Sequence, residues 1–176
     1  SEPFDPATLP AVDTTAWVTY TGPRGELTVR APASWTVKTG EQTAFSGQTV
    51  VGDSVKVLSL ANPPANPGSF SPSPGDIWAD LATEPDPVSY SPGIDDAGEF
   101  QQVRYPLDVA GQASEIVATQ FRNPPGFPPG VGGLTFFASV PTPRGGYLIA
   151  AVHVALPTDL KTVAEAQALL TEVILK

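Results

Sequence analysis

The sequence contains no cysteine, no methionine and only one histidine. Without cysteine the chain has no disulfide, no thiolate nucleophile and no cysteine-ligated zinc site. Methionine is missing even from the first position, so we expect either that a leader was removed or that the chain was cut to a mature domain, and we favour an exported domain. No apolar run approaches the roughly 20 residues that a membrane-spanning helix needs, and no signal-peptide core is present.

Basic residues are scarce as well, with 9 lysines and arginines against 18 aspartates and glutamates, for a net charge of -9. An acidic surface of this kind repels phosphate backbones, so the composition predicts that nucleic acid is not a partner. The balance also favours a protein that stays in solution as a monomer.

Acidic residues gather between Lys56 and Arg104, where the sequence has no base at all. One interpretation of the acid-rich span 76–99 is a calcium site, with carboxylate oxygens as ligands. The residues considered for it are Asp95, Asp96 and Glu99. The other interpretation is a solvated helix face, because Asp76, Asp80 and Glu84 recur at four-residue steps. No EF-hand spacing is present, so we predict no metal site and keep a calcium-binding accessory protein as an alternative function.

Proline is abundant, with 21 residues alongside 16 glycines, and both types must lie mostly in loops. Residues 1–13 contain three of these prolines and show no hydrophobic periodicity. We therefore predict that residues 1–13 form a proline-rich N-terminal tail or linker and that residues 14–176 form a single domain.

The clearest pattern covers Gly132 to Lys176, where we predict two strands and a helix. In both strands every second residue is apolar, which indicates one buried face. These residues are Leu134, Phe136, Ala138 and Val140 in the first strand, and Leu148, Ala150, Val152, Val154 and Leu156 in the second. The helix is expected to begin near Thr158 or Thr162, to place Leu170 in the middle of its apolar side and Ile174 near the end of that side, and to cover this face.

Alternating residues earlier in the chain predict further strands, and one segment predicts a second helix. Ser73 and Pro74 are typical of a helix start, and the apolar residues from Ile77 to Leu81 indicate a short helix after them. Strands joined by short turns, with helices inserted between them, favour an antiparallel sheet. The predicted fold class is α+β, an antiparallel sheet of about six or seven strands flanked by helices in an α/β/α sandwich.

Three features of the sequence are similar to the PsbP-like family. They are the aromatic strand Trp17-Val-Thr-Tyr20, the strand that ends in Ala31-Pro-Ala-Ser-Trp35, and Gly145-Gly-Tyr147 at the start of a strand before the last helix. The chain resembles in particular the LpqN-type lipoproteins of that family's bacterial branch. The resemblance spans most of the chain and implies an antiparallel sheet between helices and export from the cytoplasm. It implies no reaction.

Residues able to carry out catalysis are few. His153 is the only imidazole, so a nucleophile site of the Ser-His-acid type would have to use it, but no Gly-x-Ser-x-Gly motif is present. An acid pair for hydrolysis can also be drawn from the acidic span. We therefore keep a hydrolase that uses His153 or an acid pair as an alternative, and we predict that the protein is not an enzyme and needs no cofactor.

The loop from Arg122 to Gly133 contains two Pro-Pro-Gly runs with Phe127 between them. A stiff loop presents an aromatic ring at low entropic cost, which suits a partner-docking loop or a pocket lid. Alternatively, Phe127 plugs the edge of the sheet. The candidate ligand- or partner-binding residues are Phe127, Arg122 and Val131.

Together these observations predict an exported, non-enzymatic module of the lipoprotein type. We expect it to bind a protein partner or a small apolar ligand at the cell surface, and to contact a membrane only through a lipid anchor.

Overall fold

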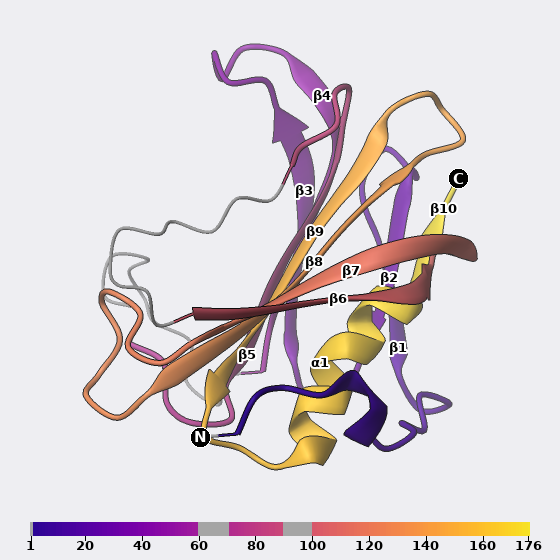
Figure 1. Ribbon diagram of the computed structural model, residues 1–176. Helices are drawn as coiled ribbons and strands as arrows, with labels where there is room; N and C mark the ends of the chain where they lie inside the picture. Colours follow the sequence, from indigo (N-terminus) through magenta and orange to yellow (C-terminus); the bar gives the residue numbers. More distant parts are fainter. Residues whose placement is uncertain (1, 60–70, 90–99) are drawn as a thin grey trace.

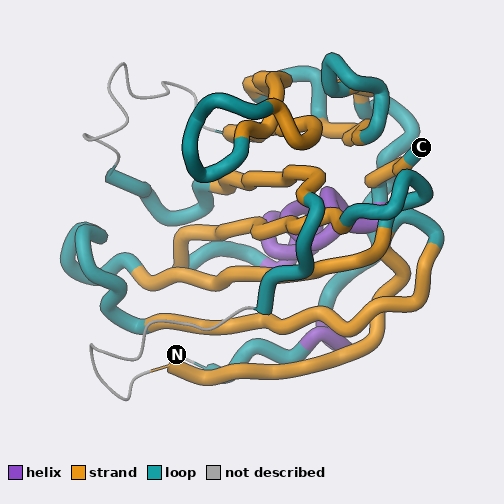
Figure 2. The backbone as a smooth tube through the Cα atoms, turned by 90° about the horizontal axis from the view of Figure 1, so that it is seen from above, coloured by secondary structure: helices purple, strands orange, loops and turns teal. Residues whose placement is uncertain are grey.

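The computed structural model describes residues 2–59, 71–89 and 100–176, which form two antiparallel sheets and one α-helix. The predicted α/β/α sandwich is wrong, because the described chain is mostly β and a single helix, α1 (Leu160–Thr171), lies against the sheets. Figure 1 shows α1 crossing the face of the larger sheet, and Figure 2 shows the strands as successive rows with this helix near the middle.

The larger sheet has seven strands, and neighbours in it are not always neighbours in sequence. In order across the sheet they are β3 (Thr36–Thr43), β4 (Val50–Leu58), β5 (Ile77–Glu84), β9 (Tyr147–Leu156), β8 (Gly132–Pro141), β7 (Gln112–Phe121) and β6 (Phe100–Val109). Strand β9 therefore lies between β5 and β8, and it joins two halves of the sheet that are formed by separate parts of the sequence.

The smaller sheet consists of β1 (Val18–Thr21), β2 (Leu27–Ala31) and β10 (Val173–Leu175). Strand β10 follows α1 directly and pairs with β2, so the chain leaves its helix at Glu172 instead of continuing it to the end as the periodicity predicted. The side chain of Ile174, expected on the apolar face of the helix, consequently lies on β10 and is half exposed.

The predicted helix after Ser73 is also wrong, because residues 71–76 form a turn and Ile77–Glu84 form β5. Gly75 adopts a positive φ of 91°, and the Asp76 carboxylate accepts from the Ser73 amide at 2.8 Å. The buried residues of β5 are the alternate ones: Ile77, Ala79, Leu81 and Thr83. Pairing with β4 and β9 stabilises the strand. The sequence of this segment fits the alternation of a strand as well as the spacing of a helix, so periodicity alone did not distinguish the two.

The apolar faces of β8 and β9 form the centre of the core, as their alternation predicted. Phe136, Leu148 and Val152 are fully buried, and the same cluster includes Val163, Leu169 and Leu170 of α1. The helix begins one residue after Asp159, whose carboxylate accepts from the Thr162 amide at 2.7 Å, so neither predicted threonine is the N-cap.

The N-terminal segment, defined as residues 2–13, lies against the sheet. It contains a single 3₁₀ turn, η1 (Pro6–Thr8), and Figure 1 shows this turn beside α1. The ring of Phe4 packs edge-on against Phe136 with centroids 5.5 Å apart, and Leu9 also contacts the core. Residues predicted as a tail or linker thus cover part of the sheet that α1 leaves open.

Within the described residues, no helix combines the length and the apolar character that crossing a membrane requires.

Candidate functional site

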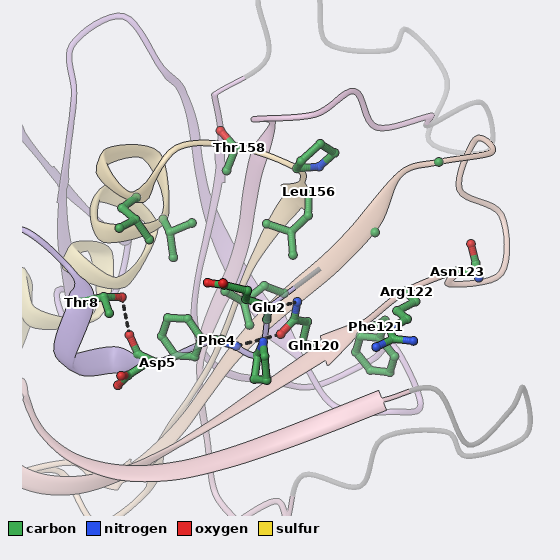
Figure 3. A pocket seen from close by; sticks show the side chains of 17 residues that line it. Glu2, Phe4, Asp5, Thr8, Gln120, Phe121, Arg122, Asn123, Leu156 and Thr158 are labelled. Carbon is green, nitrogen blue, oxygen red and sulfur yellow. Dashed lines mark hydrogen bonds between the residues drawn. The ribbon is translucent and has the colours of Figure 1, made fainter.

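A cleft of about 1080 Å³ lies where Gly132 of β8 pairs with Leu156 of β9 (Figure 3). It is bounded by the N-terminal segment, the ends of β7, β8 and β9, the 122–132 loop and the first turn of α1. Its lining residues are Glu2, Pro3, Phe4, Asp5, Thr8, Gln120, Phe121, Arg122, Asn123, Gly130, Gly132, Leu134, Leu156, Pro157, Thr158, Leu160 and Val163. This volume is comparable to the upper end of small-molecule sites, about 300–1,000 Å³.

Apolar side chains supply most of the cleft's inner surface. Leu134 and Leu156 belong to the same apolar faces of β8 and β9 that form the core, and Val163 comes from the first turns of α1. Leu134 and Val163 are buried behind the lining, whereas Leu156 is only partly buried. Because α1 begins only at Leu160, it does not cover the end of these strands. Leu160 itself remains 50% exposed, so a large apolar side chain at the cleft faces water.

The N-terminal segment is held in place as one wall of the cleft. The Phe4 amide donates to Oε1 of Gln120 at 2.9 Å, and Nε2 of the same side chain donates to the Glu2 carbonyl at 3.3 Å. Gln120 is buried, and Phe4 also lies 6.2 Å from the Tyr105 ring. One glutamine side chain therefore satisfies two backbone groups of the segment in addition to lining the cleft.

Polar groups lie at both ends of the cleft and differ in charge. Figure 3 shows Arg122 and Asn123 at one end, and Asp5 and Thr8 at the other. The Asp5 carboxylate accepts from the Ala7 amide at 3.0 Å, so it is already engaged in capping η1. Within residues 2–59, 71–89 and 100–176, no ion pair is formed by Arg122, whose side chain is exposed.

The three residues predicted to bind a ligand or partner do not lie together. Arg122 lines the cleft, whereas Val131 is buried between the two lining glycines Gly130 and Gly132. Phe127 lies elsewhere, with its ring 5.8 Å from that of Trp78 and its edge 3.5 Å from the position of a Cβ on Gly133. Of the three, only Arg122 can touch a ligand in the cleft as the structure stands.

His153 lies away from the cleft on the opposite face of β9. Its ring stacks on Trp78 with centroids 5.2 Å apart, and Nδ1 lies 2.9 Å from the hydroxyl of Thr135, which is itself buried. Burial lowers the pKa of His153, although the negative charge of Asp80 acts in the opposite direction. These contacts are those of a neutral imidazole packed within a sheet.

The acidic residues considered for calcium are placed only in part. Asp95, Asp96 and Glu99 lie outside the described residues, while Asp80 on β5 pairs with Lys56 at 3.7 Å and Asp76 belongs to the turn before this strand. In the part of the chain that the structure describes, no group of three or more potential metal-ligating side chains comes together.

Two buried carboxylates lie together near the ends of β8 and β9 that are farther from the cleft. The sequence did not identify either of them as a candidate. Asp53 is fully buried and accepts from the backbone amides of Arg24, Glu26 and Leu27 at 2.7, 2.8 and 3.1 Å. Glu26 accepts from the Thr83 hydroxyl at 2.7 Å. We refer to Asp53 and Glu26 with these partners as the carboxylate network.

Two arginines complete the carboxylate network. Oε1 of Glu26 lies 3.1 Å from Arg24 and 3.5 Å from Arg144, and Arg144 belongs to the turn between β8 and β9. Burial acts to raise the pKa of the Glu26 carboxyl, but the hydrogen bond from Thr83 and the nearby arginines outweigh it and lower this pKa. Because these oxygens are all occupied by protein donors, the network has the character of a structural joint between the two sheets.

The chain matches no protein-family model, and no curated protein is significantly similar to it. The resemblance to the PsbP-like family therefore stays a prediction.

Proposed function

We propose that this domain is a non-enzymatic binding module that holds a small ligand with an apolar body in the cleft beside its N-terminal segment. The observation that supports this proposal is the apolar floor of the cleft, where Leu156 of β9 is only partly buried and Leu160 of α1 is half exposed. Leu160, half exposed at this floor, would gain from being covered by an apolar group.

The shape of the site favours a small molecule over the protein partner that was the other predicted ligand. A stable protein interface buries roughly 800 Å² on each partner and is usually shallow, whereas small-molecule sites are concave and mostly apolar with a few polar groups. The cleft has walls on several sides, and its lining combines apolar side chains with polar groups that lie at both ends and, at Glu2, between them. It therefore suits a ligand that enters it.

We also propose that the module works outside the cytoplasm as a lipoprotein-type domain, which rests on the resemblance stated above. Fractionation of cells that express the full-length gene product tests this part of the proposal separately. We expect the protein in the cell envelope or the medium, and recovery from the cytosol alone would contradict it.

A fluorescent probe without charge, N-phenyl-1-naphthylamine, tests binding in the cleft. Its emission rises in apolar surroundings, so titration into the protein should give a saturable signal that decanol displaces. The variant Leu160→Asp places a charge at the cleft floor, and we expect it to weaken probe binding about tenfold, which corresponds to about 1.4 kcal/mol.

Ile174→Asp is the matched control for this experiment. Ile174 is 46% exposed, close to the 50% of Leu160, but it lies on β10 and does not line the cleft. The control should bind the probe as the unchanged protein does. If the unchanged protein gave no saturable signal, or if both variants lost it equally, the cleft would not be an apolar binding site.

A further inference from the structure

We infer that the ligand of this cleft carries an anionic head group and that Arg122 pairs with it. The inference rests on the proposed function, because it names the chemistry of a ligand for the same site. It would give the cleft a defined direction, with the apolar body over Leu156 and Leu160 and the head group at the exposed end of the 122–132 loop.

The state of the other arginines makes Arg122 stand out. The remaining four are Arg24, Arg30, Arg104 and Arg144, and each lies within 2.9–3.5 Å of a carboxylate oxygen. Among the described residues Arg122 has no such carboxylate neighbour, and it lies instead at the end of an apolar cleft.

Charges on the other side of the cleft favour the same orientation. Asp5 lies at the end away from Arg122, and Glu2 lines the cleft between them on the N-terminal segment. Both carboxylates repel an anion, so an anionic group is best placed at the Arg122 end. A cationic head group would instead be drawn toward the N-terminal segment, which makes the two alternatives distinguishable by experiment.

A guanidinium binds carboxylates and phosphates with the same two-pronged geometry. The shared chemistry is therefore a single-chain amphiphile with a carboxylate or phosphate head. Dodecanoate and dodecyl phosphate represent the two sources, and dodecyltrimethylammonium represents the opposite charge on the same chain.

Calorimetric titration of the three amphiphiles, each below its critical micelle concentration, tests the inference. We expect both anions to bind more tightly than the cation, and to weaken about two- to fivefold in Arg122→Gln, as for an exposed charge pair. The cation should bind Arg122→Gln at least as well as it binds the unchanged protein. Lys38→Gln removes the same charge from β3, far from the cleft lining, and should leave all three affinities unchanged.

Salt provides a second readout that a merely structural role of Arg122 would not change. Raising the ionic strength should weaken the binding of both anions to the unchanged protein and should have a smaller effect on their binding to Arg122→Gln. Equal binding of anions and cation, unaffected by Arg122→Gln, would overturn the inference while leaving the apolar cleft in place. Absence of binding by all three, together with failure of the uncharged probe, would overturn the proposed function itself.

Discussion

The two ends of β8 and β9 differ. At one end, which we call the closed end, buried polar side chains fill the space between the two sheets. At the other end, the open end, the same two strands border a cleft. The closed end holds the carboxylate network, in which Asp53 accepts three backbone amides and Glu26 contacts Arg144 of the turn that joins the strands. At the open end, Gly132 and Leu156 lie beside the N-terminal segment and the start of α1.

The difference shows where this fold can accept a ligand. A buried charge is tolerated only where its hydrogen bonds are satisfied, and within the described residues no buried side-chain nitrogen or oxygen lacks a partner. The carboxylate network therefore has no unsatisfied buried side-chain atom with which a ligand could form a hydrogen bond. The cleft has the reverse composition, with apolar surface left in contact with water and an arginine at its edge. Five predictions test this contrast.

The largest effect is expected at Asp53. Replacing Asp53 with alanine leaves the buried amides of Glu26 and Leu27 and the partly buried amide of Arg24 without an acceptor, which should reduce the free energy of unfolding by about 3–5 kcal/mol. Denaturant titration measures this loss. Asp80→Ala, which removes an exposed carboxylate from a 3.7 Å pair, should cost less than about 1 kcal/mol. Similar losses in both variants would mean that the network does not hold the sheets together.

The second prediction compares the two ends of α1. Its first residue, Leu160, lines the cleft, whereas Leu170 near its last turn is buried in the core. Leu170 is fully buried, so Leu170→Ala should cost roughly 2–5 kcal/mol through lost contacts and the cavity left behind. Leu160→Ala makes the same change at the half-exposed cleft floor and should cost less than about 1 kcal/mol. Lys161→Ala, nearby on the helix, should cost less than about 0.5 kcal/mol. A neutral Leu170→Ala would show that α1 is not docked as described.

The sequence predicted this packing well because the signal was local. The alternation in β8 and β9 and the position of Leu170 follow from a periodicity of two in strands and 3.6 in a helix, and both survive in the fold. The prediction failed at Ile77–Glu84, where helical and strand spacings both fit and where pairing between β4 and β9 decided the outcome. Because this segment is a strand, the described chain has one α-helix, and the α/β/α class is wrong.

The cleft and the network were not predictable, since each depends on residues far apart in sequence. Gln120 binds Glu2 and Phe4 over more than 115 positions, and nothing in a proline-rich tail indicates such a partner. Asp53 looked like one acid among many in an acidic chain. The only indication in the sequence is that Phe4 and Leu9 are apolar residues in a segment whose prolines favour a tail. Arg122 was a candidate binding residue only because of the loop to which it belongs, and the structure places it in the lining of the cleft.

Acid provides the third test, because it acts on Glu26 at the closed end. The folded state lowers the pKa of this carboxyl, so the unfolded chain binds more protons as the pH falls below about 4.5. The stability that ionised Glu26 contributes is thus present above the unfolded pKa and is lost as the pH falls through the folded one. At pH 7, Glu26→Gln should cost about 1.5–3 kcal/mol through weakened charged hydrogen bonds.

Unfolding curves of both proteins from pH 7 to pH 3 measure this dependence. The difference in the free energy of unfolding between the unchanged protein and Glu26→Gln should be largest near pH 7 and should become smaller in acid. A difference that stays constant over this range would show that the charge on Glu26 does not contribute to the joint.

The fourth prediction concerns the wall of the open end. Gln120→Leu removes both hydrogen bonds to the N-terminal segment, at a cost of about 0.5–1.5 kcal/mol for each net bond. The sharper readout is hydrogen exchange, in which the Phe4 amide should lose protection while amides of β8 keep theirs. Gln112→Leu is the control, because Gln112 donates to the Pro141 carbonyl at an exposed position away from this wall. Unchanged protection at Phe4 would mean that ring packing alone holds the segment.

The smallest effect is expected beyond the closed end, at the tip of the hairpin between β3 and β4. Phe45 is fully exposed there, in a turn closed by the Gly47 amide donating to the Ala44 carbonyl at 2.7 Å. Phe45→Ser keeps this turn and removes no buried surface, so it should change the free energy of unfolding by less than about 0.5 kcal/mol. Paired denaturant titrations at two protein concentrations measure the change. A loss above 1 kcal/mol that grows with concentration would show that Phe45 is covered by a second copy, and the closed end would then have an apolar surface of its own.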